Sequence, residues 1–237
     1  MKYKYKIAAA IIGVAVFGLI FWGIRSSQEL TGEQILTRTA ITYKNCRSYR
    51  DSGTIKYSLG GLSVEGVFTT AFVRPDRFRY ELKANSKAPT RSQYKPRDIH
   101  YIVGRQGTDT FQFYNLHRPK LKKSDSFPVA IAGATGISGF LATAPVDLLL
   151  PDEMKASSNI TNLQDVSRLK DEKSNGRDCY RIEGIYLDKN TTLWIDKQTF
   201  LIRRIDWQGE IVNTTIWEPI VDAAIADEAL ELKIPPQ

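Results

Sequence analysis

The residue types that most often carry catalysis or bind metals are sparse in this sequence, and their spacing fits no catalytic or metal-binding motif. The two histidines, His100 and His117, stand outside HExxH and any other ligand spacing, so we expect no metal site. Residues 136–139 (GISG) lack the spacing and the strand–turn–helix setting of a nucleophile elbow. Residues 133–136 (GATG) lack the lysine of a phosphate-binding loop. The sequence therefore predicts no cofactor and no enzymatic activity.

Carboxylates are the remaining route to acid–base chemistry. Asp147, Asp152 and Glu153 lie close together in the sequence, and paired carboxylates with different pKa values form many acid–base sites. The sequence shows neither a cleft nor a partner for them, so we interpret them as solvated loop residues and disfavour a hydrolase.

The basic charge of the chain is concentrated at its N-terminus. The formal net charge is +7, and four of the 33 basic residues flank the first apolar run, namely Lys2, Lys4, Lys6 and Arg25. Setting these aside leaves 29 basic against 26 acidic residues. So small an excess gives weak support for nucleic-acid binding, and we expect no nucleic-acid partner.

The N-terminal apolar run fits a single membrane crossing. Residues 7–24 carry no charge and would span roughly 27 Å as a helix, close to the ~30 Å hydrocarbon core of a bilayer. The lysines before the run place the rest of the chain outside the cytoplasm. A cleaved signal peptide is the alternative, although the run is long and bulky residues occupy the exit site. We predict a cytoplasmic stub and inner-membrane anchor at residues 1–27, with residues 28–237 in the periplasm, or secretion to the periplasm if the run is cleaved.

The clearest periodicity lies in residues 62–83, which read as two strands joined by an Arg-Pro-Asp corner. Phe68 and Phe72 share one face of the first strand, while Phe78, Tyr80 and Leu82 share one face of the second. Alternation with a period of two predicts a sheet with one apolar and one polar face. The same pattern elsewhere predicts about ten antiparallel strands in two runs, ending in a short strand at residues 230–234.

Two segments outside these runs are predicted to be helical. Residues 31–45 open with the capping-box pair Thr31 and Gln34 and should pack on the sheet. Residues 118–159 separate the two runs of strands, are apolar on most faces and lack alternation. We interpret them as a helical insertion that covers the apolar face of the sheet as a lid. The fold class is therefore α+β, mainly antiparallel β.

The arrangement of the 25 aromatic residues motivates a binding hypothesis. For any single aromatic side chain, core packing is the ordinary explanation. If the lid covers the sheet incompletely, however, the gap between them is apolar and of ligand size. The proposed lining residues are Phe68, Phe72, Phe78, Tyr80, Tyr101, Phe111, Phe113, Trp194 and Trp207, and the proposed lid residues are Ile137, Phe140 and Leu141. Alternation alone does not decide which of the later aromatic residues face inward.

Cys46 and Cys179 are the only cysteines. A domain outside the cytoplasm permits a disulfide, so we predict that the two are bridged. Two buried free thiols are the alternative.

Residues 73–81 (VRPDRFRYE) resemble the bacterial lipoprotein carrier and receptor family, the LolA/LolB-like proteins. Residues 49–53 (YRDSG), 194–199 (WIDKQT) and 226–232 (ADEALEL) are similar to other parts of that family. The resemblance implies a curved half-open barrel that holds acyl chains under a helical lid, with Arg74 as the latch of the lid. This sequence departs from the family pattern because it keeps an anchor segment and has no cysteine for lipid attachment.

Together these observations predict non-enzymatic binding of a lipid or a lipoprotein acyl chain at the cell envelope, in the manner of a carrier or chaperone. The expected partners are a lipid or an acylated protein, the membrane through the N-terminal helix, and an envelope protein. The alternative is a protein-interaction or sensing module whose core is filled by its own side chains.

Overall fold

The computed structural model describes residues 29–88, 97–115, 119–155 and 159–233. The chain divides into residues 1–31 and residues 32–237, and the fold described is that of the second unit. Residues 7–24, predicted to be an anchor or a signal peptide, lie outside the described ranges. Within those ranges, no helix is both long and apolar enough to cross a bilayer.

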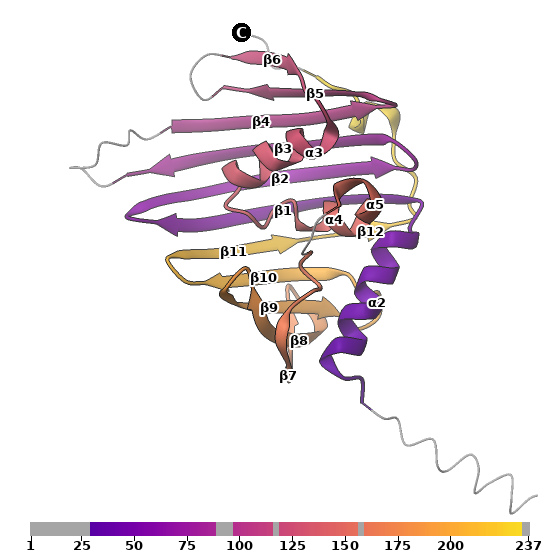
Figure 1. Cartoon of the computed structure of the whole chain (residues 1–237), viewed down its shortest axis with the longest axis vertical. Helices are drawn as coiled ribbons and strands as arrows, with labels where there is room; N and C mark the ends of the chain where they lie inside the picture. The colour runs from indigo at the N-terminus through magenta and orange to yellow at the C-terminus, as the bar shows by residue number, and fades with distance from the viewer. Residues whose placement is uncertain (1–28, 89–96, 116–118, 156–158, 234–237) are drawn as a thin grey trace, which may run out of the picture. The chain divides into compact units, whose positions relative to one another are not determined.

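One antiparallel sheet dominates the second unit (Figure 1). Eleven strands follow the order β6-β5-β4-β3-β2-β1-β11-β10-β9-β8-β7, and β12 pairs with β1. The two runs of strands thus join in the middle, along β1 and β11. The strands are β1 (Ser48–Leu59), β2 (Leu62–Val73), β3 (Arg77–Lys87), β4 (Arg97–Gln106), β5 (Asp109–Tyr114), β6 (Lys120–Lys123), β7 (Gln164–Ser174), β8 (Arg177–Tyr186), β9 (Lys189–Asp196), β10 (Ile202–Gln208), β11 (Ile211–Trp217) and β12 (Ile220–Val221).

The sheet is curved and open, as the sequence predicted. Figure 1 shows β2, β3 and β4 face-on while β7 and β8 turn nearly edge-on, and β6 and β7 end the strand order without pairing with each other. The described chain has twelve strands rather than about ten, because β6 and β12 are short additions. The strand predicted at residues 230–234 was wrong. A 3₁₀ turn, η1 (Asp227–Ala229), begins a segment that crosses the sheet instead of pairing with it.

Among the described residues, four α-helices accompany the sheet, and the predicted N-terminal helix is confirmed as α2 (Gly32–Asn45). The insertion contains α3 (Phe127–Ile137), α4 (Ala144–Leu149) and α5 (Pro151–Met154). Helix α3 begins where the Ser126 hydroxyl accepts a hydrogen bond from the Val129 amide, with Pro128 in the first turn. It packs on β4 and β5, whereas α4 packs on α2. We refer to residues 127–154 as the lid.

The register divides the sheet into two faces, because residues directly opposite each other on neighbouring strands point to the same side. Phe68 lies opposite Leu82, and Leu82 lies opposite Tyr101. Phe78 shares this side and contacts Phe127 of the lid, with 4.9 Å between ring centroids. We call this side the inner face and the opposite side the outer face.

Candidate functional site

The inner face gathers five of the predicted lining residues. Phe68, Phe72, Phe78, Tyr80 and Tyr101 stand in neighbouring rows of β2, β3 and β4, and none is more than 3% exposed. Alternation along residues 62–83 explains why the first four could be predicted from the sequence, whereas Tyr101 lies outside that hairpin, in β4. Their own packing and the lid together remove them from solvent.

Trp207 also belongs to the inner face, on the far side of β1. It lies opposite Asn213 of β11, which lies opposite Tyr57 of β1. Its ring meets the Phe140 ring of the lid edge-on, with centroids 5.7 Å apart. The structure therefore brings a predicted lining residue and a predicted lid residue together at this end of the sheet.

Three predicted lining residues point the other way. Phe111 lies opposite Gly104, and Phe113 opposite Ile102, which places both on the outer face. Trp194 lies opposite Arg204 and Arg181, also on the outer face. These three do not join the inner aromatic cluster. Alternation within β5 and β9 shows which residues share a face, but it does not show which of the two faces is the inner one.

The predicted lid residues surround a tight joint after α3. Leu141 is fully buried, Ile137 is half-buried and Phe140 is exposed at its outer edge. The Ile137 carbonyl accepts a hydrogen bond from the Tyr57 hydroxyl at 3.1 Å. Gly139 has a φ of +68°, and a Cβ there would lie 2.5 Å from a Tyr57 ring carbon. Only glycine fits both the left-handed backbone and this close approach.

Arg74 holds the lid and α2 together at the corner between β2 and β3. Its guanidinium donates to the Lys44 carbonyl at 2.6 Å and to the Cys46 carbonyl at 2.7 Å, both at the end of α2. The same group donates to the Leu149 carbonyl of α4 at 2.7 Å and lies over the Phe72 ring. One cation thereby satisfies carbonyls that two helix ends leave unpaired.

Arg105 forms a second connection between the sheet and the lid, and this connection was not predicted from the sequence. Its guanidinium pairs with Glu153 of α5 at 2.5 Å and lies over the Phe127 ring of α3 at 5.0 Å. Glu153 is therefore an ion-pair partner rather than a free loop carboxylate. Asp147 of α4 also belongs to the lid, and burial raises the pKa of its carboxyl group to about 6.

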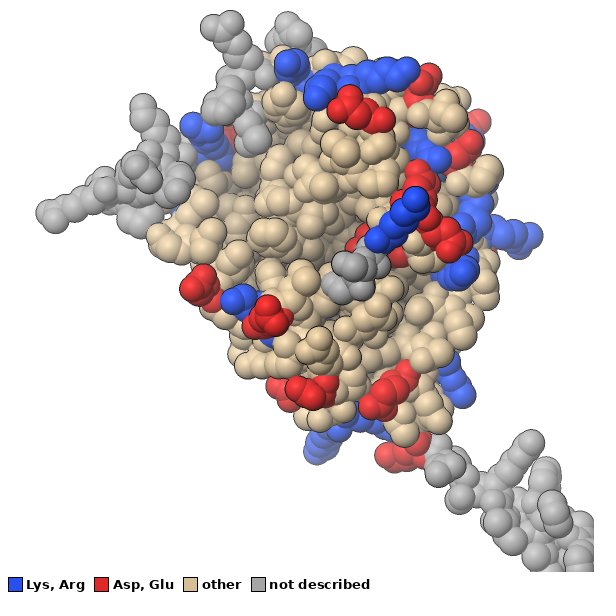
Figure 2. Space-filling model, viewed as in Figure 1, with Lys and Arg blue, Asp and Glu red and all other residues tan. Residues whose placement is uncertain are grey.

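The inner face carries almost no charge at its centre. Along β1, β2, β3 and β11, Asp51 is the one inner-face residue of the Asp, Glu, Lys and Arg types. Burial raises the pKa of Asp51 to about 7, although hydrogen bonds from Tyr49 and Thr70 oppose that shift. Figure 2 shows the lid-bearing side with charged residues mainly around its margin. The site is suited to an uncharged ligand.

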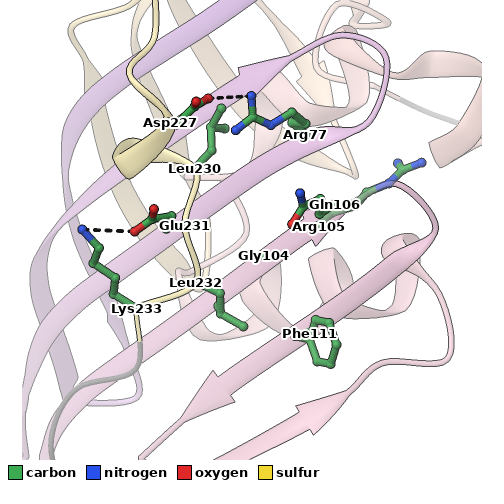
Figure 3. Close-up of a pocket in the computed structure, with 10 residues that line it drawn as sticks. All are labelled: Arg77, Gly104, Arg105, Gln106, Phe111, Asp227, Leu230, Glu231, Leu232 and Lys233. Atoms are coloured by element: carbon green, nitrogen blue, oxygen red, sulfur yellow. Dashed lines mark ion pairs between the residues drawn. The ribbon is translucent and has the colours of Figure 1, made fainter.

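The outer face holds a separate hollow of about 570 Å³, where the C-terminal segment crosses β3, β4 and β5 (Figure 3). We call residues 227–233 the strap. Arg77 pairs with Asp227 at 2.8 Å at one end of it, and Leu232 lies over Gly104, where a Cβ would be 2.9 Å from its Cδ1. The lining mixes both signs of charge with apolar groups, so it presents no single ligand chemistry.

The predicted disulfide is wrong, because both cysteines are buried free thiols. Cys46 Sγ contacts the Tyr43 carbonyl at 3.2 Å, and Cys179 Sγ contacts the Arg177 carbonyl at 3.5 Å. Each thiol is thus directed to its own local backbone. Burial raises the pKa of both thiols to about 11.

Neither histidine belongs to the site. His100 lies on the outer face with its Nε2 at 2.7 Å from Glu81, and His117 lies outside the described residues. Across the part of the chain that the structure describes, no three His, Cys, Asp or Glu side chains are grouped so as to hold a metal.

No family model and no curated protein matches the chain. Solved structures do match, at low identity. LprF from Mycobacterium bovis is 12% identical, with 86% of this chain and 96% of that chain covered and a TM-score of 0.48. Mycobacterium tuberculosis lipoprotein LppX is 10% identical, with 82% and 97% covered and a TM-score of 0.46.

A LolA superfamily protein from Nitrosomonas europaea is 12% identical, with 86% of this chain and 98% of that chain covered and a TM-score of 0.27. A curved antiparallel sheet, helices over one face and an arginine at the β2–β3 corner are all present in this chain. The likeness concerns the fold alone.

Proposed function

We propose that this domain binds the acyl chain of a lipid or lipoprotein between the lid and the inner face, and releases it chemically unchanged. The observation that carries the proposal is the lid itself. Its inner side is apolar, it lies on an aromatic face with few charged residues, and no strand pairs it to the sheet. A cover of this kind separates from the sheet by breaking a few side-chain bonds.

The energetics favour an acyl chain as the guest. Each CH₂ group that leaves water contributes about 0.8 kcal/mol, so a sixteen-carbon chain gains on the order of 10 kcal/mol on full burial. That gain offsets the separation of the lid from the aromatic rows, because the guest replaces the apolar contacts that the lid loses. A charged guest would lose its hydration without compensation on this face.

Arg74 gives the lid a preformed latch. Its bonds to Lys44 and Cys46 fix the guanidinium against α2, whether or not the lid is in place. Breaking the single bond to Leu149 releases the end of α4 while the arginine stays ordered. The family resemblance of the Arg-Pro corner supports the same role.

The predicted anchor would hold the domain at the membrane. A domain tethered by residues 7–24 outside the cytoplasm takes up its guest at the membrane and passes it on there. Such a protein acts as a fixed chaperone of acyl chains at the cell envelope rather than as a carrier that travels between membranes.

A second function is favoured by one observation. Phe68, Phe72, Phe78 and Tyr80 are at most 1% exposed, so in this conformation the inner face is filled by the protein itself. If the lid stays closed, the domain is an interaction or sensing module that binds an envelope protein through its surface.

Native mass spectrometry of the full-length protein, extracted in detergent, separates the two functions. We expect a lipid-sized adduct on the wild type and faster hydrogen exchange in residues 127–149 of Arg74→Ala. Arg77→Ala is the matched control, because it removes an arginine three residues away that contacts the strap and not the lid. If no variant carries an adduct or enhances a fluorescent apolar probe, and lid exchange is unchanged in Arg74→Ala, the interaction module replaces the acyl-binding proposal.

A further inference from the structure

Three polar atoms on the inner face have no hydrogen-bond partner among the described residues. They are Asp51 Oδ1, the Tyr80 hydroxyl and the Trp217 indole Nε1. Tyr80 and Trp217 are fully buried, and Asp51 is 7% exposed. An unpaired polar atom away from water costs stability, so three in one region of a core call for a physical reason.

The register places these three side chains in two adjacent rows of the sheet. Asp51 lies opposite Thr70, and Thr70 lies opposite Tyr80, which makes one row across β1, β2 and β3. In the next row, Trp217 and Phe68 lie on either side of Gly53. The three groups therefore share one small area at the middle of the inner face.

Aromatic contacts join the two rows. The Phe68 ring lies 6.0 Å from Trp217 and 6.1 Å from Tyr80, between ring centroids. Gly53 permits this, because a Cβ there would lie 2.2 Å from the Phe68 ring. The apolar centre of the cluster is thus a phenylalanine, with a phenol on one side and an indole on the other.

The neighbours of Asp51 and Tyr80 show where the cluster is already hydrogen-bonded and where it meets the lid. Asp51 Oδ2 accepts a hydrogen bond from the Tyr49 hydroxyl at 2.5 Å, and hydrogen bonds from Thr70 also lower the pKa of Asp51, while Oδ1 has no partner of normal geometry. Tyr80 faces the Ser138 side chain at the end of α3, without a hydrogen bond of normal geometry between them. The cluster thus meets the lid at the point where α3 ends.

The other buried polar atoms without partners differ from these. Three are guanidinium Nε atoms of Arg79, Arg181 and Arg203, each of which forms ion pairs through its other nitrogens. The fourth is the hydroxyl of Thr39 in α2. The inner cluster alone combines a carboxyl, a phenol and an indole on one sheet face.

We propose that Asp51, Tyr80 and Trp217 form a polar subsite beneath the lid that binds the carbonyl of an acyl group and a neighbouring N–H or O–H. This proposal rests on the acyl-binding function above, and it specifies which part of the ligand the domain recognises. A carbonyl oxygen accepts two hydrogen bonds, which matches the two donors, Tyr80 and Trp217. The adjacent N–H or O–H donates to Asp51 Oδ1.

This chemistry selects among acyl compounds. Amides and hydroxyl-bearing esters supply both the acceptor and the donor, whereas a methyl ester supplies only the acceptor. An ionised fatty acid would place its carboxylate beside Asp51, where the two negative charges repel each other. The subsite therefore favours linked acyl chains over free fatty acids.

Competition against a fluorescent apolar probe on the full-length protein tests the subsite. The competitors are N-palmitoylethanolamine, monopalmitoylglycerol, methyl palmitate and palmitate. We expect the first two to compete at least 5-fold more strongly than the last two at pH 8. The relative strengths of the amide and the ester distinguish a lipoprotein-like linkage from a glyceride-like one.

Tyr80→Phe and Trp217→Phe are the decisive variants, with Tyr114→Phe as a matched control on the same face near the sheet edge. We expect each decisive variant to weaken amide binding about 5-fold, as one lost hydrogen bond predicts, and Tyr80→Phe to melt no lower than the wild type. A structural role for the hydroxyl would instead lower the melting temperature.

The two failures are distinguishable. If the wild type binds the probe but both variants retain their amide affinity within 2-fold, the polar subsite is wrong while acyl binding stands. If the wild type binds neither probe nor competitor, acyl binding itself fails and the subsite fails with it.

Discussion

The two faces of the sheet belong to the same strands, but their aromatic residues are shielded from water by different groups. On the inner face, Phe68 packs against Tyr80 and Trp217 and is covered by other apolar groups. On the outer face, Trp194 lies between guanidinium groups, with Arg204 at 4.5 Å and Arg181 at 5.6 Å from its ring centroid.

This difference shows why a ligand site belongs to one face. Guanidinium groups cover an aromatic ring while keeping their own charge in water, so the outer aromatic residues need no separate cover. At the centre of the inner face, Phe68, Tyr80 and Trp217 pack on one another rather than under guanidinium groups, and the lid, residues 127–154, covers this side of the sheet. A sheet face that is sealed by a detachable segment can exchange that segment for a guest, whereas a face sealed by its own strands cannot.

Truncating one phenylalanine on each face gives the largest expected contrast. Phe68→Ala should lower the free energy of unfolding by about 3–5 kcal/mol, because Phe68 is buried in the centre of the inner face. Phe111→Ala, on the partly covered outer face, should cost about 1 kcal/mol. Urea unfolding followed by tryptophan fluorescence measures both.

The same pair tests the location of the binding site. The cavity left by Phe68→Ala should increase the capture of a small apolar probe, and Phe111→Ala should leave capture unchanged. Equal capture by both variants would mean that the inner face is not the apolar site.

Acidic residues on the two faces should give opposite pH dependence. Burial raises the folded-state pKa of Asp51 from 3.8 to about 7, so the folded protein holds a proton that the unfolded chain has released. Stability from this group is therefore full below pH 3.8 and is lost as the pH rises to about 7, by at most about 4 kcal/mol. On the outer face, partial burial opposes the shift, but hydrogen bonds from Arg79 and His100 hold the pKa of Glu81 at about 2.

The contribution of Glu81 has the reverse sign. It is present above pH 4.5 and is lost as the pH falls toward 2. Urea unfolding of the wild type, Asp51→Asn and Glu81→Gln from pH 3 to pH 8 separates the two. The stability of Asp51→Asn relative to the wild type should rise between pH 4 and pH 7, and that of Glu81→Gln should fall as the pH rises from 3 to 5. A constant difference between wild type and Asp51→Asn would show that Asp51 does not change its protonation beneath the lid.

The first hairpin shows how far sequence alone reached. Phe78 and Tyr80 alternate with charged residues, and Phe68 shares its parity with Phe72 in the preceding strand, so the face of each strand followed from its period of two. The apolar insertion had no strict alternation, and covering the apolar face was its simplest position. The antiparallel sheet, the helix after residue 31 and the lid were therefore predictable.

What the sequence missed depends on contacts between distant strands. The side of Trp194 is fixed by Arg181 and Arg204 on neighbouring strands, and no local signal marks those arginines as ring partners. Leu230 and Leu232 alternate as in a strand, yet Gly104 of β4 accepts Leu232 from above, and the segment crosses the sheet. The burial of Asp51 was not predicted, because Thr70 and Tyr80 lie in one row with it only in the folded sheet.

Replacing Arg204, which stacks on the Trp194 ring of the outer face, should change the free energy of unfolding least. Arg204→Gln removes a cation from the Trp194 ring and breaks the pair with Asp206 at 2.6 Å, and should cost about 1 kcal/mol. Lys56→Gln is the matched control, since it breaks the solvent-exposed Lys56–Glu65 pair at 2.9 Å and should cost less than Arg204→Gln. Both losses should shrink in 1 M salt, and neither variant should alter probe capture. An Arg204→Gln variant that bound the apolar probe would show that the outer aromatic residues also become a binding surface once their cations are removed, and the lid would then not be what distinguishes the two faces.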